Sequence, residues 1–296
     1  ANFIKNNSRN IRIKSVRNSA GTTIVSLQGA NDFHMIKWGK LPLEIPRGFH
    51  IVVQDGDLSV KGFLPKFAND ERQEVMNPDV FSDMTSAIFS IKLSGSLGMC
   101  FTVETSRNGE LNFKCTSKNY AGDDSDYVKK ISAIFNSFLD IAMEPDTRKE
   151  FLRTVHENGI TISGEFMFAD DKVHGYIVKR DCFAVTNIST SVGDFNSIVK
   201  HFSHKEKTDF CEKFDLPYAP YIVLDESNAN TFFTELDKVR DFLDYQKFEK
   251  ICDDLNLEIF SNFNHMSLIG NRIEGGVVFF EYLDKPKYTF KYKAPL

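Results

Sequence analysis

The chain has 296 residues, a hydrophobic content of 42% and a formal net charge of -5 at pH 7, so it is long enough to bury a sizeable core. No window approaches the roughly 18 consecutive apolar residues of a membrane helix, and the N-terminal segment lacks the apolar core of a signal peptide. The acidic balance excludes a uniformly basic surface for nucleic acid, and five scattered cysteines without a C-x-x-C pair predict neither a disulfide framework nor a zinc site. We therefore expect a folded cytoplasmic or nuclear protein with reduced cysteines, most of them in the core.

The first half of the chain is predicted to be rich in strands. Short runs of Ile, Val and Phe are bounded by Gly, Asn and Asp, which is typical of strands; these runs cover residues 23–27, 49–54, 87–93, 98–104 and 111–116. Apolar residues then recur at helical spacing over residues 127–142, after an acidic segment at 123–126 that favours a helix start. A second helix is predicted over residues 145–155.

The second half returns to strands and then to charged helices. Residues 161–168 and 173–179 predict a hairpin around an acidic turn, and residues 195–214 and 228–255 have a charged helical pattern. Residues 277–282 and 287–293 predict a closing hairpin. Since no repeat or linker interrupts this order, the sequence predicts one α+β domain.

A lysine at a tight turn stands out between two predicted strands. Lys92-Leu93-Ser94-Gly95 forms a K-x-x-G element in which Lys92 ends one strand and Gly95 lets the backbone pass close to a ligand. Lys172-Val173-His174-Gly175 is a second match, but Lys172 lies in a polar turn among acidic residues, where a solvated lysine is expected. The context therefore favours Lys92 as a nucleophile.

Three later elements follow Lys92 in a particular order: Glu165 after Gly164, then Glu274-Gly275-Gly276-Val277, then Lys291-Tyr292-Lys293. Taken singly, each glutamate or lysine is a common surface residue. In this order they resemble motifs I, III, IV and V of the covalent nucleotidyltransferase superfamily of ligases and capping enzymes, which run as K-x-x-G, an acidic strand, E-G-x-V and K-x-K. The resemblance implies a nucleotidyltransferase fold, with antiparallel sheets flanked by helices around an ATP cleft, over residues 1–296.

Two upstream features narrow this resemblance. Arg47-Gly48-Phe49 and the later run Leu64-Pro65-Lys66-Phe67-Ala68-Asn69 are similar to the R-G and P-K-F-F-N pattern of the RNA ligase 1 family and of fungal-type tRNA ligases. Ala68 departs from the pattern, which has a second phenylalanine there. The K-x-x-G element continues as Ser96-Leu97, which resembles the RNA ligase 1 family. Residues 116–119 and 290–293 look more like the fungal-type tRNA ligases, so both branches stay open.

The resemblance also implies a role for each motif residue. Lys92 would attack the α-phosphate of ATP and form lysyl-AMP, Lys291 and Lys293 would act on the phosphates, and Glu274 would hold Mg²⁺ or Mn²⁺.

Six further residues would bind the nucleotide or its phosphates. They are Arg47 and Lys66 for the phosphates, Gly95 for close approach, Glu165 for the ribose, Lys118 for a phosphate or the RNA end, and Phe183 as a candidate for stacking on the base.

The implied reaction joins RNA ends that carry a 5′-phosphate and a 3′-hydroxyl, as in RNA repair or tRNA splicing. The chain has no phosphate-binding loop of a kinase and only one H-x-[ST] element, so an end-healing kinase or phosphatase would act in trans or from a missing fused domain. The C-terminal domain that selects RNA in such ligases is also expected to be absent. The alternatives are a GTP-dependent capping guanylyltransferase and a catalytically weak module that binds RNA ends.

Overall fold

The computed structural model describes residues 11–29, 47–64, 68–69, 84–106, 109–171, 178–191, 199–263, 272–282 and 288–294. The chain forms two compact units. Unit 1 consists of Ala1–Lys66, Ser96–Phe166 and Val185–Leu216, and unit 2 of Phe67–Gly95, Met167–Ala184 and Pro217–Leu296. Because these segments interleave, the units are not consecutive domains, and the assignment of residues 1–296 to one nucleotidyltransferase domain stays a prediction.

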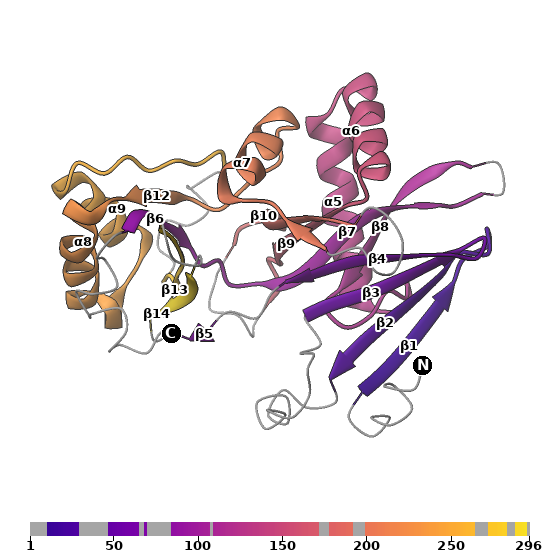
Figure 1. Ribbon diagram of the computed structural model, residues 1–296, viewed down its shortest axis with the longest axis horizontal. Helices are drawn as coiled ribbons and strands as arrows, with labels where there is room; N and C mark the ends of the chain where they lie inside the picture. The colour runs from indigo at the N-terminus through magenta and orange to yellow at the C-terminus, as the bar shows by residue number, and fades with distance from the viewer. Residues whose placement is uncertain are drawn as a thin grey trace. The chain divides into compact units, whose positions relative to one another are not determined.

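Unit 1 begins with an antiparallel sheet of four strands in sequence order, drawn in indigo in Figure 1. The strands are β1 (Ile11–Arg17), β2 (Thr23–Gly29), β3 (Arg47–Gln54) and β4 (Asp57–Leu64). One face of this sheet is buried, because Ile24 and Val52 pack with Phe101 and Val103 of a second sheet. The layers of unit 1 are therefore joined by an apolar core.

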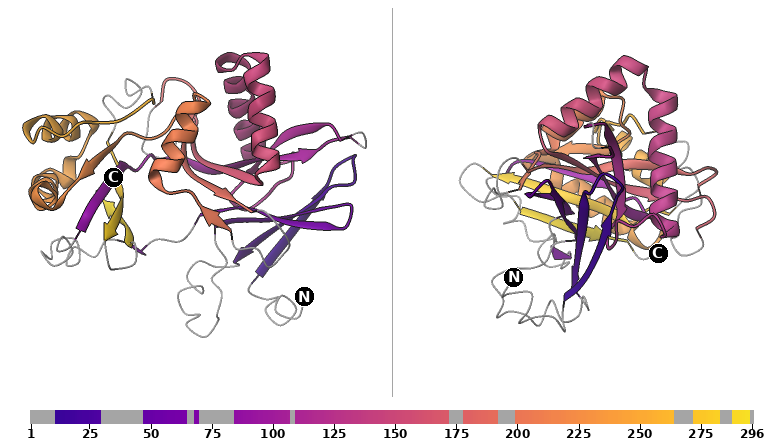
Figure 2. Two further views of the ribbon diagram at one scale, coloured as in Figure 1. Left: turned by 45° about the horizontal axis from the view of Figure 1, so that its top comes forward. Right: turned by 90° about the vertical axis from the view of Figure 1, so that its right-hand side faces the viewer.

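The second sheet has the strand order β11-β10-β9-β7-β8. Its strands are β7 (Ser96–Glu104), β8 (Leu111–Ser117), β9 (Ile160–Met167), β10 (Cys182–Thr190) and β11 (Lys200–His201). Helices α5 (Asp126–Ala142) and α6 (Pro145–Glu157) pack on β8 and β7, as the views in Figure 2 show. Helix α7 (His204–Lys213) begins at a capping box in which Ser203 and Glu206 bond each other's backbone N–H groups.

Unit 2 contains a sheet with the strand order β12-β6-β13-β14-β5. Its elements are β5 (Ala68–Asn69), β6 (Met84–Ile91), β12 (Tyr221–Leu224), α8 (Glu226–Lys238), the 3₁₀ helix η1 (Arg240–Phe242), α9 (Tyr245–Asp254), β13 (Gly275–Tyr282) and β14 (Tyr288–Lys293). All pairs are antiparallel except β14 with β5, which is parallel. The predicted α+β class with antiparallel sheets and helices is confirmed.

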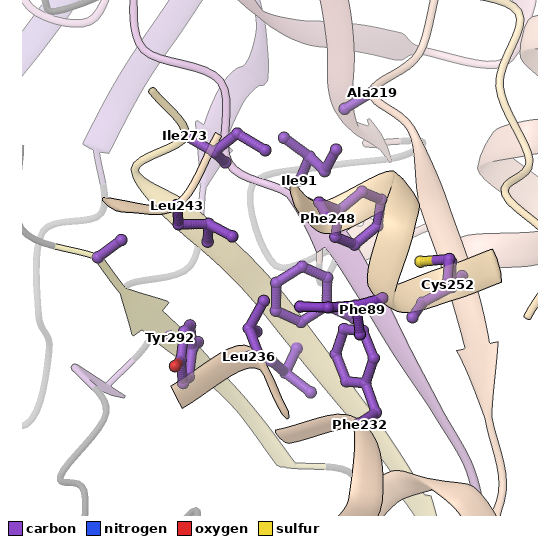
Figure 3. Close-up of a cluster of buried hydrophobic side chains, with 14 of the residues drawn as sticks. Phe89, Ile91, Ala219, Phe232, Leu236, Leu243, Phe248, Cys252, Ile273 and Tyr292 are labelled. Atoms are coloured by element: carbon purple, nitrogen blue, oxygen red, sulfur yellow. The ribbon is translucent and has the colours of Figure 1, made fainter. Parts of the chain in front are cut away.

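Phe89 of β6 lies at the centre of the core of unit 2, as Figure 3 shows. Its ring centroid is 5.2 Å from that of Phe232 and 5.8 Å from that of Phe248, which come from α8 and α9. Tyr292 of β14 makes an edge contact with Phe89 at 6.2 Å. Large aromatic rings contribute strongly to core packing, so this cluster fixes β6 and β14 beneath the two helices.

Two sequence-based predictions for the second half need correction. Residues 195–214 were predicted to be helical, but Lys200–His201 form strand β11, and α7 begins only at His204, directly after its N-cap Ser203. The helical pattern over residues 228–255 is interrupted, because α8 ends at Lys238 and Asp244 caps α9 by accepting a hydrogen bond of 2.8 Å from the Lys247 N–H. The predicted strand at 173–179 lies largely outside the described residues, and β10 is the strand next to β9.

The other predicted elements lie within a few residues of the observed ones. Four of the five cysteines are buried, as expected, and Cys182 is half-buried. Within the described ranges, no helix is both long and apolar enough to span a membrane.

A buried histidine joins the two sheets of unit 1. His50 is fully buried, with Nδ1 2.9 Å from the Ser26 hydroxyl and Nε2 3.1 Å from the Thr116 hydroxyl. Desolvation by burial lowers the pKa of His50 to about 4, despite a backbone hydrogen bond at Ser117 that acts in the opposite direction. The imidazole is therefore neutral in the folded chain at neutral pH.

We expect His50 to make unit 1 less stable in mild acid. The unfolded chain takes up the proton near the ordinary histidine pKa of about 6.5, so the stabilisation is complete above that pH and is lost as pH falls towards about 4. The unfolding free energy should fall by about 2 kcal/mol from this group between roughly pH 7.5 and pH 5. Urea unfolding of wild type and His50→Gln at several pH values isolates the contribution of His50 to the unfolding free energy. A His50 imidazole with a pKa near 6.5, measured by NMR in the folded chain, would contradict this prediction.

Candidate active site

Three neighbouring strands of unit 2 bring the predicted nucleophile and two later motifs to one end of the sheet. Lys92 directly follows β6, as predicted, and its N–H donates to the Gly275 carbonyl at 2.9 Å. Gly275 in turn pairs with Lys293 of β14, and the Glu274 carbonyl accepts a hydrogen bond of 3.0 Å from the Ala294 N–H. The backbone ladder therefore aligns Lys92, Glu274 and Lys293.

The side chains of Lys92 and Glu274 meet directly. The Lys92 ammonium group donates to Oε2 of Glu274 and forms an ion pair with it. The Ser94 hydroxyl donates to the other oxygen, Oε1, at 2.6 Å. The exposed fractions of the Lys92 and Glu274 side chains are 24% and 20%, so both charged groups stay within reach of a ligand from solvent.

The two lysines of β14 lie on the face of the sheet opposite the aromatic core. Side chains alternate along a strand, and Tyr292, between Lys291 and Lys293, is buried against Phe89. Lys291 lies opposite Val277 and is half-buried, whereas Lys293 is exposed. The face away from the aromatic core therefore carries two cations on β14, and β14 pairs with β13, the strand that begins directly after Glu274.

Arg240 anchors the end of β14. Its Nε donates to the Lys293 carbonyl at 2.6 Å, and its guanidinium lies 4.6 Å from the centroid of the Tyr292 ring. Its Nη1 is also 3.6 Å from the carboxylate of Asp237. A cation over an aromatic ring stabilises both groups, so Arg240 fixes the backbone that carries Lys293.

Both glycines after Glu274 are required by the geometry. Gly275 has a φ of 106°, and a Cβ there would lie 1.9 Å from the Tyr292 carbonyl oxygen. A Cβ on Gly276 would lie 2.3 Å from the ring of Phe89. Gly275 is needed because β13 lies close to the backbone of β14, and Gly276 is needed because β13 lies close to the ring of Phe89 in the core.

We expect Gly275→Ala to destabilise the chain by about 3 kcal/mol or more, because it combines backbone strain with a clash against main-chain atoms. Gly56→Ala is a matched control, since Gly56 has a φ of 90° but a Cβ added there would meet nothing within 4 Å. It should cost only the strain of about 1–2 kcal/mol. Thermal unfolding of both variants tests this, and equal losses would contradict the clash.

Unit 1 holds two of the other predicted residues. Glu165 of β9 pairs with Leu97 of β7, and the Lys118 N–H donates to the Leu97 carbonyl at 3.1 Å. Glu165 and Lys118 therefore lie on the two sides of Leu97. Leu97 follows Lys92 by five positions in the sequence.

The remaining predicted residues are less informative. Arg47 is the first residue of β3 and pairs with Leu64, but its side chain is not among those described, and Lys66 lies outside the described residues. Gly95 is partly exposed at the end of the K-x-x-G element. Phe183 in β10 is only 3% exposed, and its role in stacking on a base stays a prediction.

Two residues of the site carry no assignment from sequence. Ser94 lies within the K-x-x-G element, yet its partner Glu274 is 180 positions away along the chain, and no local pattern connects the two. Arg240 lies in a charged stretch that only predicts a helix. Neither contact follows from periodicity.

The site offers a single carboxylate to a divalent cation. In the part of the chain that the structure describes, no three His, Cys, Asp or Glu side chains gather to hold a metal ion. Glu274 offers one carboxylate, and Mg²⁺ is commonly held by one or two carboxylates with substrate phosphates and water. Glu274 therefore fits as the protein ligand of such an ion.

No protein-family model and no curated protein matches the chain. Among solved structures, an archaeal ATP-dependent RNA ligase is similar over 99% of this chain and 61% of its own, with a TM-score of 0.57 and 14% identity. A protein assigned as an ATP-dependent DNA ligase from Aquifex aeolicus matches over 98% and 62%, with a TM-score of 0.53 and 11% identity. A Naegleria gruberi RNA ligase variant with ATP and Mn has a TM-score of 0.47 and 11% identity, over 95% of this chain and 74% of its own.

The chain spans about three fifths of the length of the first two of these proteins. At identities this low the similarity concerns the fold. The order of the strands, the lysine after β6 and the glutamate before β13 agree with the fold expected from the motifs. We conclude that the chain has the nucleotidyltransferase fold of the covalent ligases.

Proposed function

We propose that this chain is the adenylyltransferase part of an ATP-dependent RNA ligase in which Lys92 accepts AMP from ATP. The observation that carries this proposal is the ion pair of Lys92 with Glu274 at an accessible end of the sheet, beside the strand of Lys291 and Lys293. Covalent nucleotidyl transfer needs a nucleophile, a carboxylate and cations near the phosphates. These residues supply all three.

In the first step, Nζ of Lys92 attacks the α-phosphorus of ATP. A phosphorus–nitrogen bond forms, and the bond from phosphorus to the pyrophosphate oxygen breaks. The ammonium group must lose a proton before it can attack, because its lone pair is otherwise occupied. Glu274 contacts that ammonium group in the free chain, so its carboxylate is in a position to take part in the proton transfer.

The lysines of β14 would act on the phosphates. Negative charge builds up on the α-phosphate and on pyrophosphate during the transfer, and fixed cations stabilise it. Lys291 and Lys293 project from the strand next to β13 on the face away from the core. A divalent cation held by Glu274 would add positive charge at the same phosphates.

The second and third steps would join RNA ends. An oxygen of a 5′-phosphate attacks lysyl-AMP, which gives RNA-adenylate and frees Lys92, and a 3′-hydroxyl then displaces AMP to form the phosphodiester bond. The preference for RNA over DNA rests on the motifs at Arg47-Gly48-Phe49 and residues 64–69. An end-healing kinase or phosphatase acting in trans would supply RNA with these ends.

The proposed roles of the remaining residues follow the same motifs. Glu165 would accept hydrogen bonds from the ribose hydroxyls, and Arg47 and Lys66 would bind phosphates. Phe183, which no motif assigns, is the candidate for stacking on the base. Gly95 would let the nucleotide approach the backbone, and Lys118 would contact a phosphate or the RNA end.

This proposal is tested by asking whether the chain uses ATP or GTP and whether it transfers the nucleotide to RNA or to DNA. The wild-type chain is incubated with Mg²⁺ and α-labelled ATP or GTP. One part of the sample is analysed by denaturing electrophoresis for label on the protein, and a second, native part is given nicked RNA or nicked DNA with a 5′-phosphate. We expect label from ATP alone and transfer of AMP to RNA. Label from GTP would indicate a capping guanylyltransferase, transfer to DNA alone would indicate a DNA ligase, and no label would favour a module that binds RNA ends.

A further inference from the structure

Ser94 is the one other side chain that holds the carboxylate of Glu274 among the residues that the structure describes. Its Oγ lies 2.6 Å from Oε1, and the hydroxyl must be the donor, because an ionised carboxylate only accepts. Ser94 is 2% exposed, so water does not readily replace it. Lys92 holds the second oxygen, Oε2. Glu274 is thus fixed by two residues of the same K-x-x-G element.

These two contacts differ in what the proposed reaction does to them. When Lys92 becomes neutral and its nitrogen bonds to phosphorus, its charge and its ion pair with Glu274 are lost. The Ser94 hydroxyl takes no part in the bond changes and can keep its hydrogen bond throughout. A hydrogen bond to a charged group is stronger than one between neutral groups, so Ser94 can still hold the carboxylate after the ion pair with Lys92 is lost.

We propose that Ser94 is a positioning residue that holds Glu274 in place during the transfer, after Lys92 has left the ion pair. This inference rests on the function proposed above and adds a residue to it. Glu274 would then remain aligned for the cation and phosphates that it serves, whereas without Ser94 it would turn away as Lys92 reacts. The effect should therefore appear in the rate of transfer and in the requirement for Mg²⁺.

The test compares Ser94→Ala, Ser94→Thr and Ser189→Ala with wild type. Ser94→Thr keeps the hydroxyl, and Ser189 is a matched control because it is also 2% exposed but lies in β10 of unit 1. Covalent labelling by α-labelled ATP is followed over time at varied ATP and Mg²⁺, and thermal unfolding checks each variant. We expect Ser94→Ala to slow labelling at saturating ATP by about 10- to 100-fold.

The half-saturating ATP concentration should change less than about threefold, whereas that of Mg²⁺ should rise, and Ser94→Thr should restore most of the rate. A merely structural serine would not shift the Mg²⁺ dependence. If Ser94→Thr unfolds at a lower temperature than Ser94→Ala, it is too unstable to serve as a rescue. The Mg²⁺ dependence of Ser94→Ala then decides whether Ser94 positions Glu274. An unchanged rate or unchanged Mg²⁺ dependence in Ser94→Ala would overturn the role of Ser94, and so would an equal loss in Ser189→Ala.

The failure of this inference is distinct from failure of the proposed function. Wild-type labelling together with a fully active Ser94→Ala removes only the positioning role. Absence of labelling in the wild type with any nucleotide removes the proposed function, and the role of Ser94 with it.

Discussion

Replacing Lys92 by alanine should abolish covalent labelling by ATP. The side chain supplies the only atom that forms the proposed bond to phosphorus, and removal of a covalent nucleophile leaves no alternative path. Lys92→Arg is expected to be equally inactive, although it keeps a positive charge beside Glu274, because a guanidinium group stays protonated. Loss in both variants, measured by denaturing electrophoresis, therefore separates the chemistry from the ion pair.

Lys172→Ala is the matched control for this prediction. Lys172 begins the second K-x-x-G element of the sequence and lies outside the described residues. Labelling of Lys172→Ala should equal that of wild type. Label retained by Lys92→Ala and lost from Lys172→Ala would reverse the assignment of the nucleophile.

Glu274→Gln should reduce the rate of labelling by about 100- to 1,000-fold, which corresponds to the loss of one well-placed electrostatic group. The amide keeps the shape of the side chain and can still accept a hydrogen bond from Ser94, but it has no charge for Lys92 or a divalent cation. The remaining activity should need more Mg²⁺ than wild type does. Time courses at varied Mg²⁺ measure both effects.

Glu281→Gln provides the comparison on the same strand, since Glu281 lies near the far end of β13 opposite Ser86. We expect its labelling to be close to that of wild type. Equal activity of Glu274→Gln and wild type would show that the carboxylate contributes no charge to the transfer.

The sequence predicted most strands and the longest helix because their apolar patterns are local. Helix α5 illustrates this point: Val128, Ile131, Phe135 and Leu139 are buried on one side at the predicted spacing. The split between α8 and α9 was missed because charged residues at helical spacing continue on both sides of it. The cap of Asp244 on the Lys247 N–H is a single polar contact that periodicity does not register.

The candidate site was predicted in outline by the order of its motifs. The apolar runs on either side of Lys92 correctly placed it at the end of a strand, and the structure brings it into contact with Glu274. The contacts of Ser94 and Arg240 could not be predicted, because each joins two residues more than 50 positions apart along the chain. The strain at Gly275 was equally hidden, since it arises from the carbonyl of Tyr292 on the neighbouring strand.

The most direct test of the central claim is to locate the nucleotide on the chain. Wild-type protein is incubated with ATP and Mg²⁺, digested, and its peptides are sequenced by mass spectrometry under conditions that preserve phosphorus–nitrogen bonds. The account predicts a single AMP adduct on the Nζ of Lys92. An adduct on Lys291, Lys293 or Lys172, or none at all, would contradict it.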